Sequence, residues 1–184
     1  MLKKSIYSLS IVFSLVFTAC SDSKDEEANA LLATNQFVLK ELSGQEYKVQ
    51  KANSGFVLAD QKDKVIMLDI FATWCPPCQA EASHLANLQK KYKNELVIIG
   101  ITIEDSITAA QLQTFRNEYG ADYALVRSSE NRRMVDEIAK NLNIGRNFGI
   151  PLMVMYKDGK IINYYQGATE EEFIESDIKR ALGK

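Results

Sequence analysis

Cysteine and histidine are scarce in this chain of 184 residues, which contains three cysteines and one histidine. Three cysteines are too few for a scaffold held together by several disulfides. Cys75 and Cys78 have the spacing of a redox pair or of half a zinc site, but no other cysteine pair supplies the second half. Because His84 is the only histidine, a four-ligand zinc site of the usual Cys/His type is excluded. We expect no metal and no other cofactor.

Basic residues are not in excess either. The chain has 22 Lys and Arg against 24 Asp and Glu, which gives a formal net charge of -2. A protein that binds nucleic acid through its phosphates needs a basic surface, so this class of partner is excluded. The composition, 46% hydrophobic and 25% charged, is ordinary for one globular domain with a short appendage.

The N-terminus lacks an apolar run long enough for a permanent transmembrane helix. Lys3 and Lys4 precede an apolar stretch at 6–19 that is diluted by serines, whereas a helix needs about 20 apolar residues to cross a bilayer. A charged start followed by a short apolar stretch is typical of a secretory signal peptide, which we predict at residues 1–19. The chain is therefore expected to be exported.

The third cysteine directly follows this signal. Residues 17–20, which end in Ala19 and Cys20, resemble a bacterial lipobox, in which the cysteine is lipidated and becomes the new N-terminus. The alternative is ordinary cleavage near Ala19, which would leave Cys20 as a free thiol. We predict a lipidated N-terminus and a solvated tether at 20–35, since the residues after Cys20 are polar and acidic. The end of this stretch could instead be a charged cap on a first helix.

Residues 36–184 are predicted to form one domain that begins with antiparallel strands. Three short β-prone pieces lie between turn residues, at 37–39, 47–49 and 56–58. The next run, 65–71, is apolar on both faces apart from Asp69. This pattern is typical of a central strand that is covered by helices on each side.

After this strand, helical and strand patterns alternate to the end of the chain. Prolines for the first turn and apolar residues at three- and four-residue steps predict a helix from Pro76 to Tyr92. We predict further strands at 96–103, 123–126, 152–156 and 161–165, and helices around Phe115, Ile138 and Ile178. A right-handed crossover then makes the first two buried strands parallel, with their carboxyl ends at one edge. The pattern predicts a single α/β domain with a mixed sheet.

The two close cysteines lie where a strand end meets a helix start. We expect Cys75 at the exposed tip of the helix, where free backbone N–H groups and the positive end of the helix dipole stabilise its thiolate. Cys78 is expected to point toward the sheet and to resolve a mixed disulfide formed by Cys75. Two alternatives are a structural disulfide, which would constrain little chain entropy at this spacing, and a thiolate pair that binds Cu(I).

The stretch from Asp69 to Glu81, Asp-Ile-Phe-Ala-Thr-Trp-Cys-Pro-Pro-Cys-Gln-Ala-Glu, resembles the thioredoxin superfamily, and specifically the membrane-tethered TlpA, ResA and CcmG (DsbE) reductases. The likeness extends with gaps from about Phe37 to the C-terminus, with a second landmark at 149–151. It implies a thioredoxin-like three-layer α/β/α sandwich with a mixed central sheet and extra N-terminal strands. In this superfamily the proline that matches Pro151 is cis and packs beside the redox cysteines.

The same resemblance implies where a substrate binds. The residues expected to contact it surround the cysteines and the proline, namely Trp74, Pro76, Pro77, Ile150 and Pro151. An exposed aromatic beside a helix tip offers a contact surface, although such a residue is often only packing.

Three acids are candidates for proton transfer. Asp69 is expected to be buried beneath the helix, where an unpaired carboxylate has a raised pKa and can accept the proton of Cys78. Thioredoxin carries an acid at the matching position. The alternative is an aspartate satisfied by backbone N–H groups, with no catalytic part. Glu104 and Asp105 follow the second parallel strand, where the related reductases keep an acid, and either one could also be a mere helix-start acid.

These residues predict a thiol-disulfide oxidoreductase, lipid-anchored to a bacterial membrane and facing the periplasm or the cell exterior. By resemblance, we expect a monomer that takes electrons from a membrane thiol donor of the DsbD/CcdA type. Its expected substrate is a protein disulfide, such as the haem-binding cysteine pair of apocytochrome c during cytochrome c maturation. One alternative is an oxidase of the same fold that introduces disulfides.

A second alternative is a copper-handling module for oxidase assembly. Copper modules of the related Sco type separate their cysteines by three residues and add a distal histidine. In this chain two residues separate the cysteines and no histidine follows His84, which disfavours copper.

Overall fold

The computed structural model describes residues 35–184. The signal peptide predicted at 1–19, the lipid site at Cys20 and all but the last residue of the tether predicted at 20–35 therefore lie outside the described residues. Within 35–184, no helix has both the length and the apolar character needed to cross a membrane.

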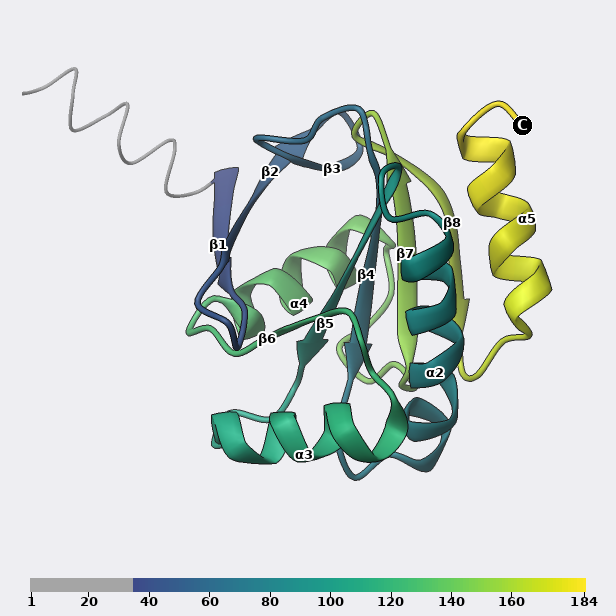
Figure 1. Cartoon of the computed structure of the whole chain (residues 1–184). Helices are drawn as coiled ribbons and strands as arrows, with labels where there is room; N and C mark the ends of the chain where they lie inside the picture. Colours follow the sequence, from purple (N-terminus) through teal and green to yellow (C-terminus); the bar gives the residue numbers. More distant parts are fainter. Residues whose placement is uncertain (1–34) are drawn as a thin grey trace, which may run out of the picture.

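Strands and helices alternate along the chain much as the sequence predicts (Figure 1). In chain order they are β1 (Gln36–Lys40), β2 (Glu46–Ala52), β3 (Gly55–Leu58), β4 (Val65–Phe71), α2 (Pro76–Lys91), β5 (Leu96–Thr102), α3 (Ala109–Tyr119), β6 (Ala124–Val126), α4 (Asn131–Asn141), β7 (Leu152–Lys157), β8 (Lys160–Gln166) and α5 (Glu171–Ala181). Two predicted strands are shorter than expected: β5 ends before Ile103, and β6 begins after Tyr123.

The central sheet is mixed, as predicted. Its strand order is β6-β5-β4-β7-β8. β4, β5 and β6 are parallel to one another, whereas β7 pairs antiparallel with both β4 and β8. The extra N-terminal strands β1, β2 and β3 form a separate antiparallel sheet. β4 thus lies in the middle of the main sheet, hydrogen-bonded on both sides.

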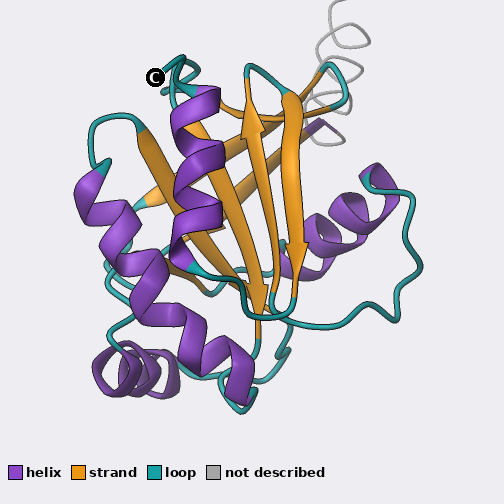
Figure 2. Ribbon diagram, turned by 90° about the vertical axis from the view of Figure 1, so that its right-hand side faces the viewer, coloured by secondary structure: helices purple, strands orange, loops and turns teal. Residues whose placement is uncertain are grey.

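Two apolar layers cover the two faces of this sheet. One layer packs α2, α3 and α5 against one face of β4, the face that carries Met67 and Phe71. The other layer packs α4 and the N-terminal sheet against the opposite face, which carries Ile66 and Leu68. Figure 2 shows helices on both sides of the strands. The fold is the predicted three-layer, thioredoxin-like α/β/α sandwich with extra N-terminal strands.

β4 is buried along its whole length because it is central in the sheet and covered on both faces. All seven of its residues are buried, including Asp69, the one residue in it with a charged side chain. β4 ends at the edge of the sheet where α2 begins, so it places Asp69 beneath that helix. The fold therefore fixes a carboxylate inside an apolar layer.

The turn between β7 and β8 ties the main sheet to the N-terminal sheet. Asp158 and Gly159 have φ values of 53° and 73°, as in the tight hairpin turn that the Asp-Gly pair predicts. A Cβ added at Gly159 would lie 2.7 Å from the carbonyl oxygen of Ala52 in β2. Gly159 is therefore required for its left-handed backbone and for close contact with the second sheet.

We expect Gly159→Ala to lower the free energy of unfolding by about 2 to 5 kcal/mol. The left-handed backbone costs a residue with a Cβ about 1 to 2 kcal/mol, and the overlap with Ala52 adds about 1 to 3 kcal/mol. Gly167→Ala is a matched control, because Gly167 has a φ of 88° but no atom within 4 Å of an added Cβ. Urea denaturation measures both variants, and equal losses would contradict the contact with β2.

Candidate active site

The two close cysteines lie at the junction of β4 and α2. Cys75 is the N-terminal cap residue of α2, and Pro76 and Pro77 occupy the first two helical positions. Proline suits these positions because its fixed φ matches the helix and its missing N–H has no partner to lose there. Cys78 lies one turn into the helix, and both cysteines are free thiols. The strand-to-helix junction predicted from the sequence is thus present.

Cys75 is less exposed than predicted. Its exposed fraction is only 4%, so the prediction of an exposed helix tip was wrong. The N–H of Cys75 donates to the carbonyl of Ala72 at 3.2 Å, across the tight turn that leads from β4 into α2. Its sulfur then lies 3.7 Å from the carbonyl oxygen of Ile150. The exposed surface around the thiol belongs instead to Trp74 and the two prolines.

The segment before β7 forms one wall of the site. The peptide bond between Ile150 and Pro151 is cis, as the resemblance implied. Pro151 is buried, Ile150 is half-buried, and the Ile150 carbonyl faces Cys75. The structure thus brings the predicted substrate-binding residues of this segment together with Cys75. Trp74, which is 65% exposed, lines the same cavity as Ile150.

Cys78 is enclosed in the apolar layer beneath α2. It is 3% exposed and packs in the core that contains Met67 and Leu85. Burial raises the pKa of the Cys78 thiol, and hydrogen bonding with Cys75 and the nearby charge of Asp69 raise it further. Cys78 is therefore held protonated at neutral pH, and it needs a proton acceptor before it can act as a nucleophile.

Asp69 lies where the sequence predicts, beneath α2 and 2% exposed. It is not fully unpaired, because its Oδ2 accepts a hydrogen bond of 3.0 Å from the hydroxyl of Tyr123. Its Oδ1 has no hydrogen-bond partner among residues 35–184. Burial raises the pKa of Asp69 to about 7, while the Tyr123 hydrogen bond opposes this shift and the charge of Glu81 adds to it. A carboxyl with this pKa can both accept and release a proton near neutral pH.

Glu81 and Tyr123 belong to this cluster, although sequence reasoning assigned neither a role. Glu81 is 2% exposed, and its Oε2 accepts a 2.9 Å hydrogen bond from the N–H of Thr169, while its Oε1 has no partner in the described part of the chain. Burial raises the pKa of Glu81. The signal for Glu81 was its spacing of three residues from Cys78, which places it on the same buried helix face.

The structure separates the two remaining acids. Glu104 accepts hydrogen bonds from the Thr73 N–H at 2.7 Å and from the hydroxyl groups of Thr73 and Thr102. It therefore ties the end of β5 to the loop that leads to Cys75. Asp105 is exposed and pairs with Arg132. Neither acid begins a helix, since α3 starts later with Thr108 as its cap.

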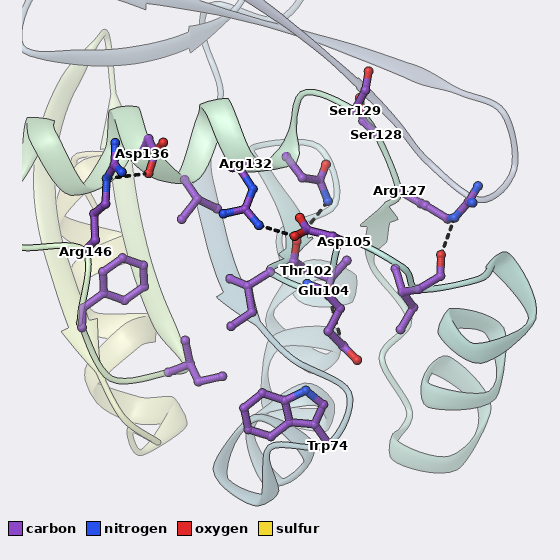
Figure 3. A pocket seen from close by; sticks show the side chains of 16 residues that line it. Trp74, Thr102, Glu104, Asp105, Arg127, Ser128, Ser129, Arg132, Asp136 and Arg146 are labelled. Carbon is purple, nitrogen blue, oxygen red and sulfur yellow. Dashed lines mark hydrogen bonds and ion pairs between the residues drawn. The ribbon is translucent and has the colours of Figure 1, made fainter.

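A cavity of about 630 Å³ extends from Trp74 and Ile150 toward α4 (Figure 3). Its lining includes apolar residues and charged pairs that neutralise each other, Arg132 with Asp105 and Arg146 with Asp136. Trp74 lies at one end of the view, with Glu104 between it and the residues of α4. The cavity is thus continuous with the wall that faces Cys75, and it carries no net charge from these pairs.

Among residues 35–184, no three His, Cys, Asp or Glu side chains lie close enough together to hold a metal ion. The site brings two thiols together with buried carboxyl groups. Cys75 lies next to the exposed residues Trp74, Pro76 and Pro77, which we call the rim. Cys78 lies behind Cys75, and Asp69 lies beneath α2.

The chain is similar to known thiol-disulfide oxidoreductases. The family model described as Redoxin matches residues 33–182. The thiol-disulfide oxidoreductase ResA of Bacillus thuringiensis is 28% identical over 148 residues, which cover 78% of this chain and 73% of the relative. ResA of Bacillus cereus is 27% identical over 162 residues, which cover 86% and 82%.

Solved structures share the fold at lower identity. A thiol:disulfide interchange protein of the thioredoxin family from Chlorobium tepidum superposes with a TM-score of 0.62 at 21% identity, covering 81% of this chain and 94% of that one. A secreted disulfide oxidoreductase of Mycobacterium tuberculosis, described as homologous to DsbE of E. coli, superposes with a TM-score of 0.58 at 19% identity, covering 80% and 98%. At these identities the likeness shows the fold.

We expect iodoacetamide to alkylate Cys75 at least about 10-fold faster than Cys78 in the reduced protein at pH 7. Burial raises the pKa of Cys78, whereas Cys75 lies at the positive N-terminal end of α2, and only the thiolate is the nucleophile. Mass spectrometry of the labelled peptides measures each cysteine separately. Equal rates at the two positions would remove the distinction between them.

We expect Asp69→Asn to gain stability over the wild type as the pH rises. The pKa of Asp69 is raised from 3.8 to about 7 in the folded chain, so the contribution of Asp69 to the stability of the wild type is fully present below about pH 4 and is lost as the pH rises through 7. The asparagine variant has no such loss, and its relative stability should increase by about 2 to 3 kcal/mol between pH 5 and pH 8. Urea denaturation at both pH values tests this. If the stability of the two proteins changes equally with pH, burial does not shift the pKa of Asp69.

Proposed function

This chain belongs to the Redoxin family and is a thiol-disulfide oxidoreductase, and we propose that it reduces protein disulfides with Cys75 as the nucleophile and Cys78 as the resolving thiol. The observation that carries this proposal is the arrangement of the two thiols. Cys75 lies at the rim beside the cis-proline segment, and Cys78 lies behind it with a raised pKa above a buried carboxyl. The two cysteines therefore differ in their readiness to react.

The first step is the attack of the Cys75 thiolate on a disulfide of the substrate. A bond forms between the Cys75 sulfur and one substrate sulfur, and the second substrate sulfur leaves as a thiolate. Cys75 makes this attack from the N-cap position of α2, beside the carbonyl oxygen of Ile150. The product is a mixed disulfide that joins the enzyme to its substrate.

The second step releases the substrate. Cys78 gives its proton to Asp69 and attacks the Cys75 sulfur, so that the Cys75–Cys78 disulfide forms and the remaining substrate sulfur leaves as a thiolate. The two electrons that reduce the substrate come from the two thiols of the enzyme. Asp69 suits this role because its pKa is about 7, so part of the population is ionised at neutral pH.

The substrate is proposed to be a polypeptide that lies along the rim. Trp74, Pro76 and Pro77 are exposed beside Cys75, and the cavity of about 630 Å³ begins at Trp74 and Ile150. The chain that flanks a substrate disulfide can occupy this cavity while the disulfide reaches Cys75. By the resemblance of the stretch from Asp69 to Glu81 to membrane-tethered reductases, we propose apocytochrome c, with its haem-binding cysteine pair, as the substrate in cytochrome c maturation.

The proposed electron donor rests on the resemblance to membrane-tethered reductases, and the proposed location rests on the N-terminal sequence. We propose that a membrane thiol carrier of the DsbD/CcdA type reduces the Cys75–Cys78 disulfide after each turnover. We also propose that the chain is held by a lipid on Cys20 and faces the periplasm or the cell exterior. The signal-like residues 1–19 and the lipobox-like residues 17–20 support this location.

The direction of electron flow is tested by the redox equilibrium of the cysteine pair. Titration of the Cys75–Cys78 couple against dithiothreitol and glutathione should place it among reducing couples, near thioredoxin rather than near the strong oxidant DsbA. A potential close to that of DsbA would favour a disulfide-forming oxidase of the same fold and would overturn the proposed direction.

We expect Cys78→Ser to accumulate a mixed disulfide with its substrate, because Cys75 still attacks but nothing resolves the product.

We expect Asp69→Asn to slow resolution by about 10- to 100-fold, the low end of general-base effects, with a smaller change in the first attack. Stopped-flow reduction of a model disulfide separates the two steps. Unchanged resolution in Asp69→Asn would show that this carboxyl is not the proton acceptor.

We expect Cys20→Ala to move the protein from the membrane fraction to the soluble fraction, because the variant has no site for the lipid. Cys75→Ser is the control, since it also loses a thiol but should stay with the membrane. A Cys20→Ala protein that remains in the membrane fraction would favour an uncleaved N-terminal helix. A wild-type protein that is already soluble would favour ordinary signal cleavage.

A further inference from the structure

Tyr123 reaches Asp69 from the far side of a neighbouring strand. It precedes β6, whereas Asp69 is in β4, and β5 lies between these two strands. The Tyr123 hydroxyl nevertheless donates a 3.0 Å hydrogen bond to Asp69 Oδ2. Tyr123 is only 5% exposed, so the bond is shielded from water. The phenol ring must therefore cross the face of β5.

Gly100 provides the space for this crossing. It is the residue of β5 that pairs with Asp69 in the parallel register. A Cβ added at Gly100 would lie 3.0 Å from Cε2 of Tyr123, 2.9 Å from Cδ2 of Leu125 and 3.2 Å from Cε1 of Phe71. These distances are shorter than ordinary van der Waals contact, so a side chain at Gly100 would push the ring away. Glycine is needed at this position because it leaves space for the Tyr123 ring, and not because of a special backbone angle.

The other groups around Asp69 favour its protonated form. From α2, Cys78 and Glu81 face it, and the charge of Glu81 raises the pKa of Asp69. From β7, its register partner is the apolar Met153. The Tyr123 hydroxyl is thus the one hydrogen-bond donor to the Asp69 carboxyl in the described part of the chain. Burial and the charge of Asp69 raise the pKa of Tyr123, so its hydroxyl keeps the proton that it donates.

We propose that Tyr123 is a positioning residue for the resolving step: its hydroxyl, placed by the gap at Gly100, holds the Asp69 carboxylate and favours its ionised form. The inference rests on the proposed function of Asp69 as the acceptor of the Cys78 proton. In that step the proton moves from the Cys78 sulfur to Asp69, the Cys75–Cys78 bond forms, and the substrate thiolate leaves. Tyr123 neither gains nor loses a proton.

The hydrogen bond has a defined effect on pH dependence. Because it stabilises the carboxylate, its removal raises the pKa of Asp69 and leaves less ionised base at neutral pH. A hydrogen bond to a charged group corresponds to about one pH unit. The resolution rate rises with pH as Asp69 ionises, and this rise is the acid limb of the pH profile. In Tyr123→Phe the midpoint of the acid limb should therefore move to a pH about one unit higher. At pH 7 resolution should be several-fold slower, and it should recover when the pH is raised past the new limb.

Two measurements on the full chain test this inference. The pH profile of mixed-disulfide decay, recorded by stopped flow, gives the acid limb in wild type and in Tyr123→Phe. The carboxyl ¹³C chemical shift of Asp69 gives its titration directly and does not depend on activity. Both should move upward together, whereas a purely structural role would lower the rate at every pH and leave the limb in place.

Matched variants separate the hydroxyl from general effects of substitution. Tyr156→Phe also removes a buried phenol hydroxyl, but this one bonds Asn141 on the opposite side of the sheet and should leave the limb unchanged. Gly100→Ala keeps the hydroxyl and displaces the ring, so it should shift the limb in the same direction as Tyr123→Phe. In an Asp69→Asn background, Tyr123→Phe should have no further effect on resolution.

Several outcomes would overturn the inference. If Asp69→Asn slows resolution but Tyr123→Phe leaves both the limb and the Asp69 titration within about 0.3 pH unit of wild type, Tyr123 has no positioning role and the proposed function stands. An equal shift in Tyr156→Phe would also remove the role. If Asp69→Asn leaves resolution unchanged, the assignment of the base fails, and the role of Tyr123 in catalysis fails with it.

Discussion

The arrangement of this site depends on one constraint, an ionisable carboxyl kept in an apolar layer. Asp69 is part of a central strand that is paired on both edges and covered on both faces, so it cannot turn toward water without disrupting the sheet. The folded protein therefore shifts its proton affinity instead. The same layer contains Cys78, whose proton is held by the same low polarity. Burial, the largest cause of both pKa shifts, thus creates a proton donor and a proton acceptor beneath one helix.

The remaining polar groups limit this effect. Tyr123 bonds one oxygen of Asp69, and the Thr169 N–H bonds one oxygen of Glu81, while the second oxygen of each acid has no partner within residues 35–184. Each buried acid is therefore only half satisfied, which costs stability but keeps it able to exchange a proton. Glu104, with three hydrogen bonds to Thr73 and Thr102, has a different part, because it fixes the loop that leads to Cys75.

The fold and the pair of cysteines were predictable because both rest on local patterns. Apolar runs identified β4 and β5, and the strand-to-helix junction placed Cys75 and Cys78. The interactions between distant segments were not predictable in this way. Tyr123 is 54 residues from Asp69 and meets it only because Gly100 leaves space between them. The cover over Cys75 comes from Ile150, 75 residues away, so a local view of the helix tip overestimated its exposure. The different contacts of Glu104 with the loop before Cys75 and of Asp105 with α4 could likewise not be read from the sequence.

The cover over Cys75 also bears on chemical damage. Oxidation of a thiol to sulfenic acid, and then irreversibly to sulfinic and sulfonic acids, follows its thiolate character and its accessibility. The segment at 149–151 contacts Cys75 and leaves it only 4% exposed, which lowers its accessibility. A small oxidant such as hydrogen peroxide gains nothing from contact with Trp74 or the cavity and meets little exposed sulfur. A polypeptide bound along Trp74, Pro76 and Pro77, as proposed, would bring its own disulfide to that sulfur. In the proposed mechanism, the atoms that shield the Cys75 sulfur from small oxidants also lie beside the surface that a polypeptide substrate would contact.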